Sequence, residues 1–313
     1  MIEVRGLTKR YGATVAVDGL DFDVAPGRVT GFLGPNGAGK STTMRMILGL
    51  DRPTAGHALV HGRPFPGYAE PLREVGALLD PGALHPGRTG RGHLRVAART
   101  NGLPDRRVEE VLELVGLGGV AKRRIKGYSL GMRQRLGIAA ALLGDPRVLL
   151  FDEPVNGLDL DGVRWIRGLL RRLADEGRTV LVSSHLLGEM QQIAERLLVI
   201  GRGRLIADAT TAEILRGLGG GRVRVRTPRA DELLAHLQRA GLTAERVAPD
   251  ELQVRDTTER AVGEAAATAA IPLHHLSETA QSLEDAYLAL TGDSVQYAGG
   301  SGAATTTTPG ATR

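Results

Sequence analysis

The segment 34–41, which reads GPNGAGKS, constrains the fold of this 313-residue chain more than any other feature. It matches the pattern G-x-x-x-x-G-K-[ST]. Glycines let a backbone wrap closely around a phosphate, so that successive N–H groups point at the anion. Lys40 would reach the β- and γ-phosphates of a nucleotide, and Ser41 would hold Mg²⁺. The pattern therefore predicts a phosphate-binding loop between a strand and a helix.

The residues on both sides of this loop have the patterns that it needs. Val29–Leu33 is a short apolar run, typical of a buried strand, and Ser41–Leu48 reads as a helix that stops before Gly49. A helix that begins here would direct its positive end at the phosphate. The alternative, a Gly-rich turn that matches by chance, explains neither flank.

A second motif, at 148–154, reads VLLFDEP and places two acids at the end of an apolar strand. Asp152 could support Mg²⁺ through a coordinated water. Glu153 could sit beside the γ-phosphate and polarise the attacking water. The alternative is a pair of exposed acids in a loop, and the apolar strand that runs directly into the pair disfavours it.

The other patterns of the first 218 residues predict a parallel sheet. Strands alternate with a helix over 148–182, which favours crossover helices. Residues 198–206 read as a hairpin around Gly201–Gly203. Residues 82–146 carry helical patterns and no convincing strand.

A second, smaller unit is predicted after Gly219–Gly221, which is a natural linker. Its pattern fits a ferredoxin-like unit. A last helix is expected at about 282–290, and residues 298–313 have the composition of a disordered tail. The predicted order is strand 222–227, helix 230–240, strand 244–248, strand 251–255, helix 258–269 and strand 271–276.

Composition excludes several classes of protein. The chain has no cysteine, so disulfides, thiolate metal sites and a cysteine nucleophile are excluded. The 40 Lys and Arg residues against 35 Asp and Glu give a net charge of +5, and we interpret the abundance of arginine as codon usage, not as a nucleic-acid signature. No apolar stretch approaches the roughly 20 residues of a membrane span. We therefore expect a cytoplasmic chain that serves any membrane process through a partner.

The segment 128–135, YSLGMRQR, lies between the two motifs and resembles the signature of ATP-binding-cassette (ABC) ATPases, usually spelled Leu-Ser-Gly-Gly-Gln. Ser129 and Gly131 are retained, while Tyr128, Leu130 and Met132 depart from the usual Leu, Gly and Gln. A capping hydroxyl and a glycine at a helix start can bind a phosphate, although the segment alone would be an ordinary helix cap. The resemblance implies that the ATP of a partner chain is contacted by Ser129, Leu130, Gly131, Met132 and Arg133.

The order of the motifs makes the resemblance specific. As in the ABC family, the order is Tyr11, the loop at 34–42, Asp80, the signature, the two acids, Asp159 and His185. The similarity covers about the first 215 residues.

This resemblance implies a fold. We expect an α/β P-loop NTPase cassette at 1–218, with a mixed-sheet core, an antiparallel β subdomain and a helical subdomain at about 82–146. The smaller α+β ferredoxin-like unit, which the pattern after the linker predicts, would occupy 222–297.

The resemblance also implies roles for single residues. Tyr11 would stack on the adenine, Asp159 would lie at a dimer interface, and His185 would contact the γ-phosphate. Asp80 stands where the family usually has a Gln that ligates Mg²⁺, and Asp is a shorter, charged ligand. Nucleotide contacts are expected from Tyr11, Gly34, Pro35, Asn36, Gly37, Ala38, Gly39, Lys40, Ser41 and Thr42. The catalytic set is Lys40, Glu153 and His185, and the metal set is Ser41, Asp80 and Asp152.

The implied cofactors are ATP and Mg²⁺, and the implied partners are a second cassette and a separate transmembrane permease, with no nucleic acid. Asp80 and the ending at 282–292 resemble the drug- and antibiotic-export branch, which places the chain on the inner face of the membrane. Two alternatives remain open at this point. One is a soluble ABC ATPase that acts on the ribosome or DNA, and the other is a weakly hydrolysing, nucleotide-switched regulator.

Overall fold

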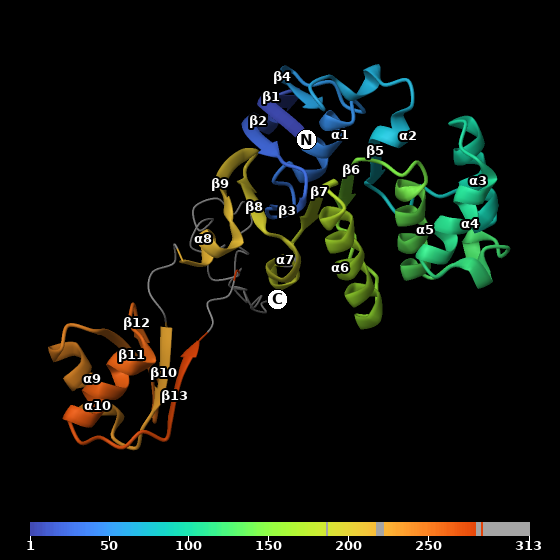
Figure 1. Cartoon of the computed structure of the whole chain (residues 1–313). Coiled ribbons are helices and arrows are strands. Elements are labelled where there is room, and N and C mark those ends of the chain that lie inside the picture. Colours follow the sequence, from blue (N-terminus) through green and yellow to red (C-terminus); the bar gives the residue numbers. More distant parts are fainter. Residues whose placement is uncertain (186, 217–221, 280–282, 284–313) are drawn as a thin grey trace, which may run out of the picture.

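The computed structural model describes residues 1–185, 187–216, 222–279 and 283. These residues form an N-terminal unit, residues 1–216, and a C-terminal unit, residues 222–279 (Figure 1). The N-terminal unit holds two of the sheets found among the described residues, and the C-terminal unit holds the third.

The first sheet of the N-terminal unit is antiparallel and has the order β2-β1-β4. Its strands are β1 (Ile2–Tyr11), β2 (Thr14–Val24) and β4 (Ala55–Val60). Alternate residues of β1 and β2 are buried, as expected of a sheet with one face on the core. This is the antiparallel subdomain that the sequence predicts.

The second sheet has the order β5-β6-β7-β3-β8-β9 and is parallel except for β9, which pairs antiparallel with β8. Its strands are β3 (Arg28–Leu33), β5 (Val75–Leu78), β6 (Val148–Asp152), β7 (Thr179–Ser184), β8 (Arg196–Gly201) and β9 (Arg204–Thr210). Because parallel strands share a direction, β3, β6 and β7 end at one edge. The predicted parallel sheet and hairpin are confirmed.

Helices pack on this sheet and connect its strands. The shorter ones are α1 (Lys40–Ile47), α2 (Pro71–Glu74), α7 (Leu187–Ile193) and α8 (Thr211–Arg216), and the longest is α6 (Leu160–Asp175). One face of α6 is buried, including Ile166, Leu169 and Leu170, and the other is charged.

Residues 82–146 form helices and no strand, as predicted. They contain α3 (Gly90–Thr100), α4 (Asp105–Leu114) and α5 (Leu130–Leu142), which lie together at one end of the N-terminal unit (Figure 1). Their buried apolar side chains join the main core. Single turns of 3₁₀ helix occur at Phe65–Gly67, Gly118–Val120 and Ile125–Gly127.

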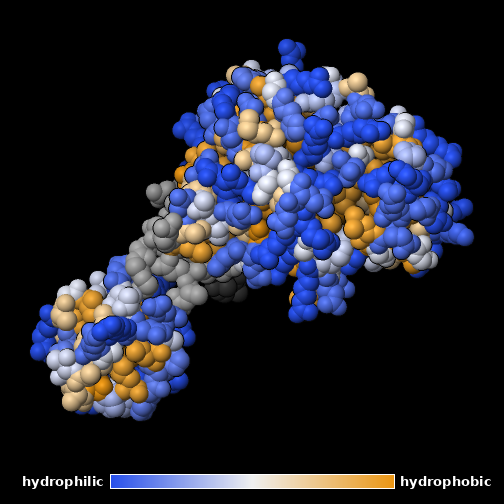
Figure 2. Space-filling view, viewed as in Figure 1, coloured by the Kyte–Doolittle hydropathy of each residue, from blue (hydrophilic) through white to orange (hydrophobic). Residues whose placement is uncertain are grey.

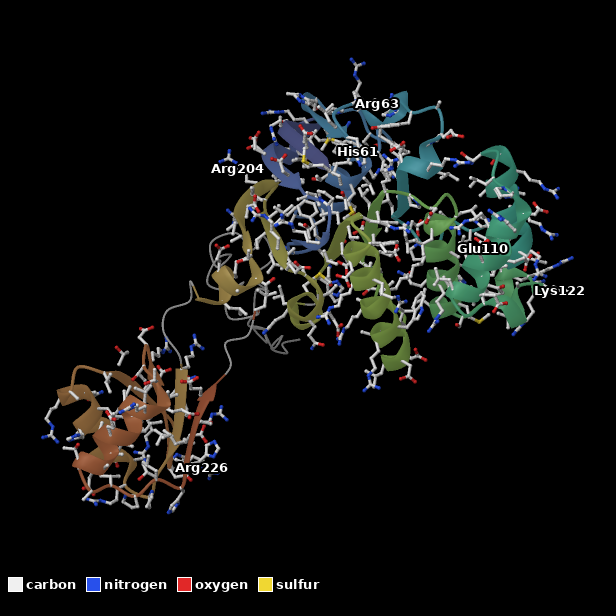
Figure 3. The ribbon with its side chains drawn as sticks, viewed as in Figure 1. His61, Arg63, Glu110, Lys122, Arg204 and Arg226 are labelled. Carbon is white, nitrogen blue, oxygen red and sulfur yellow. The ribbon has the colours of Figure 1, made fainter. Side chains whose placement is uncertain are left out.

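The C-terminal unit has the predicted ferredoxin-like order, strand–helix–strand–strand–helix–strand. Its antiparallel sheet has the order β11-β12-β10-β13, and Arg226 extends from it (Figure 3). The elements are β10 (Arg222–Arg226), α9 (Ala230–Arg239), β11 (Thr243–Ala248), β12 (Glu251–Arg255), α10 (Glu259–Thr268) and β13 (His275–Thr279). Val223, Val225, Leu252 and Val254 bury one face of this sheet against the helices.

One predicted boundary in this unit is wrong. The sequence predicts the last strand at 271–276, whereas β13 begins at His275. Ala270 adopts a left-handed backbone with φ 51°, and the N–H of Ile271 bonds back to Ala266 O at 2.9 Å. Residues 270–271 therefore close α10 and cannot start a strand.

Several predictions lie outside the described residues: the linker Gly219–Gly221, the helix at 282–290 except Leu283, and the tail at 298–313. Leu283 is buried in the core cluster of the N-terminal unit, and its N–H donates to Gln191 Oε1 at 3.1 Å.

None of the described helices combines the length and apolar character that crossing a membrane requires. Hydrophilic side chains cover most of the visible face (Figure 2).

Candidate nucleotide-binding site

The loop between β3 and α1 requires glycine at defined positions. Gly37 and Gly39 have positive φ angles of 80° and 105°, which L side chains rarely adopt. A Cβ atom at Gly39 would lie 2.6 Å from Ala16 O, and one at Gly34 would lie 2.6 Å from Ile200 O. The backbone therefore wraps tightly only because these side chains are missing.

The first turn of α1 is arranged for an anion. The N–H of Thr43 bonds to Gly39 O at 2.9 Å, so the amides of residues 40–42 precede the first intrahelical bond. The Lys40 side chain is only 6% exposed, and its ammonium donates to Gly34 O at 2.7 Å and to Pro35 O at 3.3 Å. Burial lowers the pKa of Lys40, while the negative charges of Glu153 and Asp152 oppose this effect.

Asp152, at the end of β6, faces this loop. Its Oδ2 accepts a hydrogen bond from Ser41 Oγ at 2.5 Å, and its Oδ1 accepts one from Ser183 Oγ. The side chain is buried, so these two hydroxyls offset much of the cost of taking a carboxylate out of water. Ser183 stands on β7 directly beside Asp152 in the parallel register.

Glu153 follows in a left-handed backbone conformation with φ 51°. Its N–H donates to Ser183 O at 3.2 Å and to Ser183 Oγ at 3.0 Å. Its Oε2 lies 2.8 Å from Nδ1 of the exposed His185. A strained backbone conformation of this kind persists only where neighbouring groups enforce it. Here it holds the Glu153 carboxylate at the carboxyl end of β6.

The phosphate loop and the two acids surround a hollow of about 310 Å³. Ala16, Leu79, Pro81 and Asn156 complete a lining that is otherwise made by residues 36–42, Asp152 and Glu153. Ser41 Oγ and the Asp152 carboxylate meet in it, and oxygen ligands of this kind fit Mg²⁺. No group of three or more His, Asp or Glu side chains that could hold a metal gathers among the described residues.

Asp80 is not among the residues that line this hollow. Asp80 is exposed, and its Oδ1 accepts the N–H of Gly82 at 2.6 Å, while its neighbours Leu79 and Pro81 line the hollow. The carboxylate is held by its own turn, which the sequence reading did not foresee. The structure shows the contact between Ser41 and Asp152, and the role of Asp80 at a metal stays a prediction.

Tyr11 lies beyond this hollow and is half exposed. Its hydroxyl donates to Asp51 Oδ2 at 3.1 Å, and Lys9 Nζ lies 4.9 Å from the ring centroid. The hydrogen bond fixes one end of the ring and leaves part of its surface open for stacking.

The predicted signature lies around a second hollow, of about 440 Å³. Ser129 caps α5 and accepts the N–H of Met132 at 3.2 Å. Asp159 caps α6 and accepts the N–H of Gly162 at 2.8 Å. The lining consists of Ser129, Leu130, Gly131, Met132, Arg135, Gly157, Leu158 and Asp159. Four of the five predicted signature residues thus line one hollow with Asp159, whereas Arg133 does not. None of these residues lines the hollow at the phosphate loop.

Sequence reasoning assigned no role to Ser183, which holds the two acids, or to Ala16, Leu79, Pro81 and Asn156, which line the first hollow. Ser183 bonds to both acids, yet only its place just before His185, at the end of an apolar strand, could have signalled it. Ala16 lines the hollow from β2, and no sequence pattern distinguishes it.

A glycine loop that opens a helix on a parallel sheet and faces carboxylates at the strand ends defines a P-loop nucleoside triphosphatase. The comparisons with known proteins narrow this class. A family model described as "ABC transporter" matches residues 17–156, and a "Domain of unknown function" matches residues 221–284.

Two curated relatives carry the comparison further. Bacitracin transport ATP-binding protein BcrA of Bacillus licheniformis is 41% identical over 66% of this chain and 69% of its own length. Daunorubicin/doxorubicin resistance ATP-binding protein DrrA of Streptomyces peucetius is 38% identical over 93% of this chain and 92% of its own. A solved "ATP binding subunit of ABC transporter" is 28% identical with a TM-score of 0.61, covering 69% of this chain and 92% of that one.

This chain belongs to the ABC transporter ATP-binding proteins and is an ATPase homologous to those of drug and antibiotic exporters. The fold class, the family and the ATP chemistry predicted from the sequence are confirmed.

Proposed function

We propose that this chain energises a drug or antibiotic exporter, in which two copies close on ATP and drive a separate membrane subunit. The observation that carries the proposal is the separation of two surfaces in one chain. Lys40 and the acids line one hollow, while Ser129 and Asp159 line another. A nucleotide in the first hollow would meet the signature only if a second copy supplied it.

Exposed apolar side chains at the second hollow support pairing. Leu130 is 54% exposed and Leu160 is 81% exposed, next to Ser129 and Asp159. Large apolar groups in such positions gain free energy when a partner covers them. Head-to-tail pairing would place them against the partner's nucleotide-binding surface.

The chemistry proposed for the first hollow is electrostatic. The amides of residues 40–42 and the Lys40 ammonium would bind the β- and γ-phosphates and offset charge that develops on the γ-phosphate. Ser41 and Asp152 would hold Mg²⁺, which neutralises charge on the phosphate oxygens when bound.

The same geometry suggests which groups act on the attacking water. Glu153 would orient the water and accept its proton, and His185 would hold the Glu153 carboxylate through the 2.8 Å contact. Because the Glu153 backbone is anchored at Ser183, the carboxylate needs little reorganisation before the reaction.

The transport role rests on the relatives, whose names state bacitracin transport and daunorubicin/doxorubicin resistance. We propose a peripheral location on the inner face of the membrane, with the helical residues 82–146 next to the permease. In cells that lack this chain, we expect greater drug sensitivity, which the wild-type gene restores and Glu153→Gln does not. Equal sensitivity of all three strains to a panel of such drugs would favour a soluble role.

The biochemical test uses Glu153→Gln. Hydrolysis should fall by about 100-fold or more, because the general base is lost. With ATP and Mg²⁺ the variant should elute as a dimer, and with ADP as a monomer. Glu264→Gln, at an exposed position on α10 of the C-terminal unit, is the matched control and should hydrolyse normally. Normal turnover by Glu153→Gln would remove this residue from its role, and a monomer with bound ATP would remove the pairing.

A further inference from the structure

Gln134 is a polar side chain in an apolar place. It stands on α5, five residues after Ser129, and is 0% exposed. Its Nε2 lies 3.3 Å from the backbone oxygen of Glu153, and within the described part of the chain its Oε1 has no hydrogen-bond partner. A carbonyl oxygen only accepts, so the amide nitrogen must be the end that faces Glu153.

The Gln134 amide fills this buried position at a cost in stability. A buried amide with an unused acceptor destabilises the fold, whereas an apolar side chain of similar volume would avoid that cost. The residues that follow on the same face of α5, Gly137, Ile138 and Ala141, are buried and carry no polar side-chain atom. Packing alone therefore does not account for an amide at this position.

The contact falls on Glu153, whose backbone adopts a left-handed conformation that non-glycine residues rarely adopt. Glu153 holds φ 51°, its N–H is bound by Ser183, and its oxygen accepts the N–H of Asn156 at 3.2 Å as well as Nε2 of Gln134. Both sides of the residue are thus anchored. Gln134 is the anchor that comes from the helix capped by Ser129.

We propose that Gln134 is a positioning residue that sets the backbone of Glu153 and couples the signature helix to the carboxylate facing the phosphate loop. The inference rests on the proposed role of Glu153 in hydrolysis. A displacement of α5, when Ser129 meets the nucleotide of another copy, would reach Glu153 through the Gln134 side chain. Engagement of the signature in one site would then adjust the water-orienting group in the other.

The test is Gln134→Met, which keeps the length of the side chain and removes the donor. The kcat for ATP should fall by about 10- to 100-fold, the range expected when a reacting group is misplaced by about 1 Å. KM for ATP should stay within twofold, and ATP should still drive pairing. Tm should be unchanged or higher, because an unpaired buried acceptor is removed. Gln238→Met, at an exposed position on α9, is the control and should match the wild type.

Two outcomes would overturn the proposal. One is a kcat within twofold of the wild type, and the other is a kcat loss accompanied by a lower Tm and a raised KM, which would indicate a structural role. If Gln134→Met does not fold, Gln134→Leu, which also removes the donor, is measured against the same criteria.

A double variant separates this inference from the proposed function. In the Glu153→Gln background, Gln134→Met should lower the residual rate by less than twofold, because its effect passes through Glu153. A 10- to 100-fold loss of rate from Gln134→Met in the Glu153→Gln background would contradict the positioning role. An active Glu153→Gln single variant would instead refute the proposed role of Glu153 itself.

Discussion

The two nucleotide-facing surfaces of this chain differ in composition and in completeness. The surface at the phosphate loop buries Lys40 and Asp152, and hydrogen bonds already hold each of these charges. The surface at the signature exposes Leu130, next to the capping Ser129, and Leu160, next to the capping Asp159. The first is organised for an anion within one chain. The second has the composition of an interface, and we interpret it as the half that needs another copy.

The largest expected effect is on the affinity of the monomer for ATP, which should depend on the phosphate-loop surface and not on the signature surface. Lys40→Ala should weaken ATP binding to the monomer by about 100-fold, because several charge-assisted hydrogen bonds are lost. Ser129→Ala should leave that affinity within twofold, which isothermal titration with a non-hydrolysed ATP analogue measures. Ser129→Ala should also lower the free energy of unfolding by about 1 kcal/mol, since the cap of α5 is lost. Equal losses of affinity in both variants would contradict the division.

A smaller effect is expected at the apolar side of the signature surface. Leu160→Ser should weaken ATP-driven pairing by about 10-fold or more, because burial of a leucine contributes about 1.5–3 kcal/mol. Its free energy of unfolding should change by less than about 0.5 kcal/mol, since Leu160 is already exposed in the monomer. Analytical ultracentrifugation of the Glu153→Gln background gives the dimer dissociation constant. Leu114→Ser, exposed on α4, is the control, and an equal effect there would remove Leu160 from the interface.

The strands of the parallel sheet were predictable because their apolar runs indicate both a strand and its burial on two faces. Val29–Leu33 and Val148–Phe151 are apolar because both faces of the parallel sheet are covered, so the same runs reveal strands and sheet type. The start of β13 was not predictable from the run 271–276. Its apolar Ile271 serves the end of α10, a role that depends on the turn at Ala270.

The candidate site divides in the same way. Lys40, Asp152, Glu153 and His185 were predictable because ends of neighbouring parallel strands meet. The hydrogen bond that the Asp80 side chain accepts within its own turn could not be predicted, because it depends on the local backbone geometry. Gln134 could not be predicted, since its contact with Glu153 joins two elements whose relative position only the folded chain defines.

The central claim is that each nucleotide lies between the phosphate loop of one copy and the signature of another. The chain has no cysteine, so single cysteines placed in the Glu153→Gln background report this directly. Asn36→Cys marks the loop hollow and Ser129→Cys marks the signature hollow, on separate preparations that are then mixed. With ATP, Mg²⁺ and an oxidant, the account predicts a covalent heterodimer in the mixture, little covalent product from either preparation alone, and none with ADP. No heterodimer in the ATP-bound mixture, or equal cross-linking of Ser129→Cys with itself, would contradict the account.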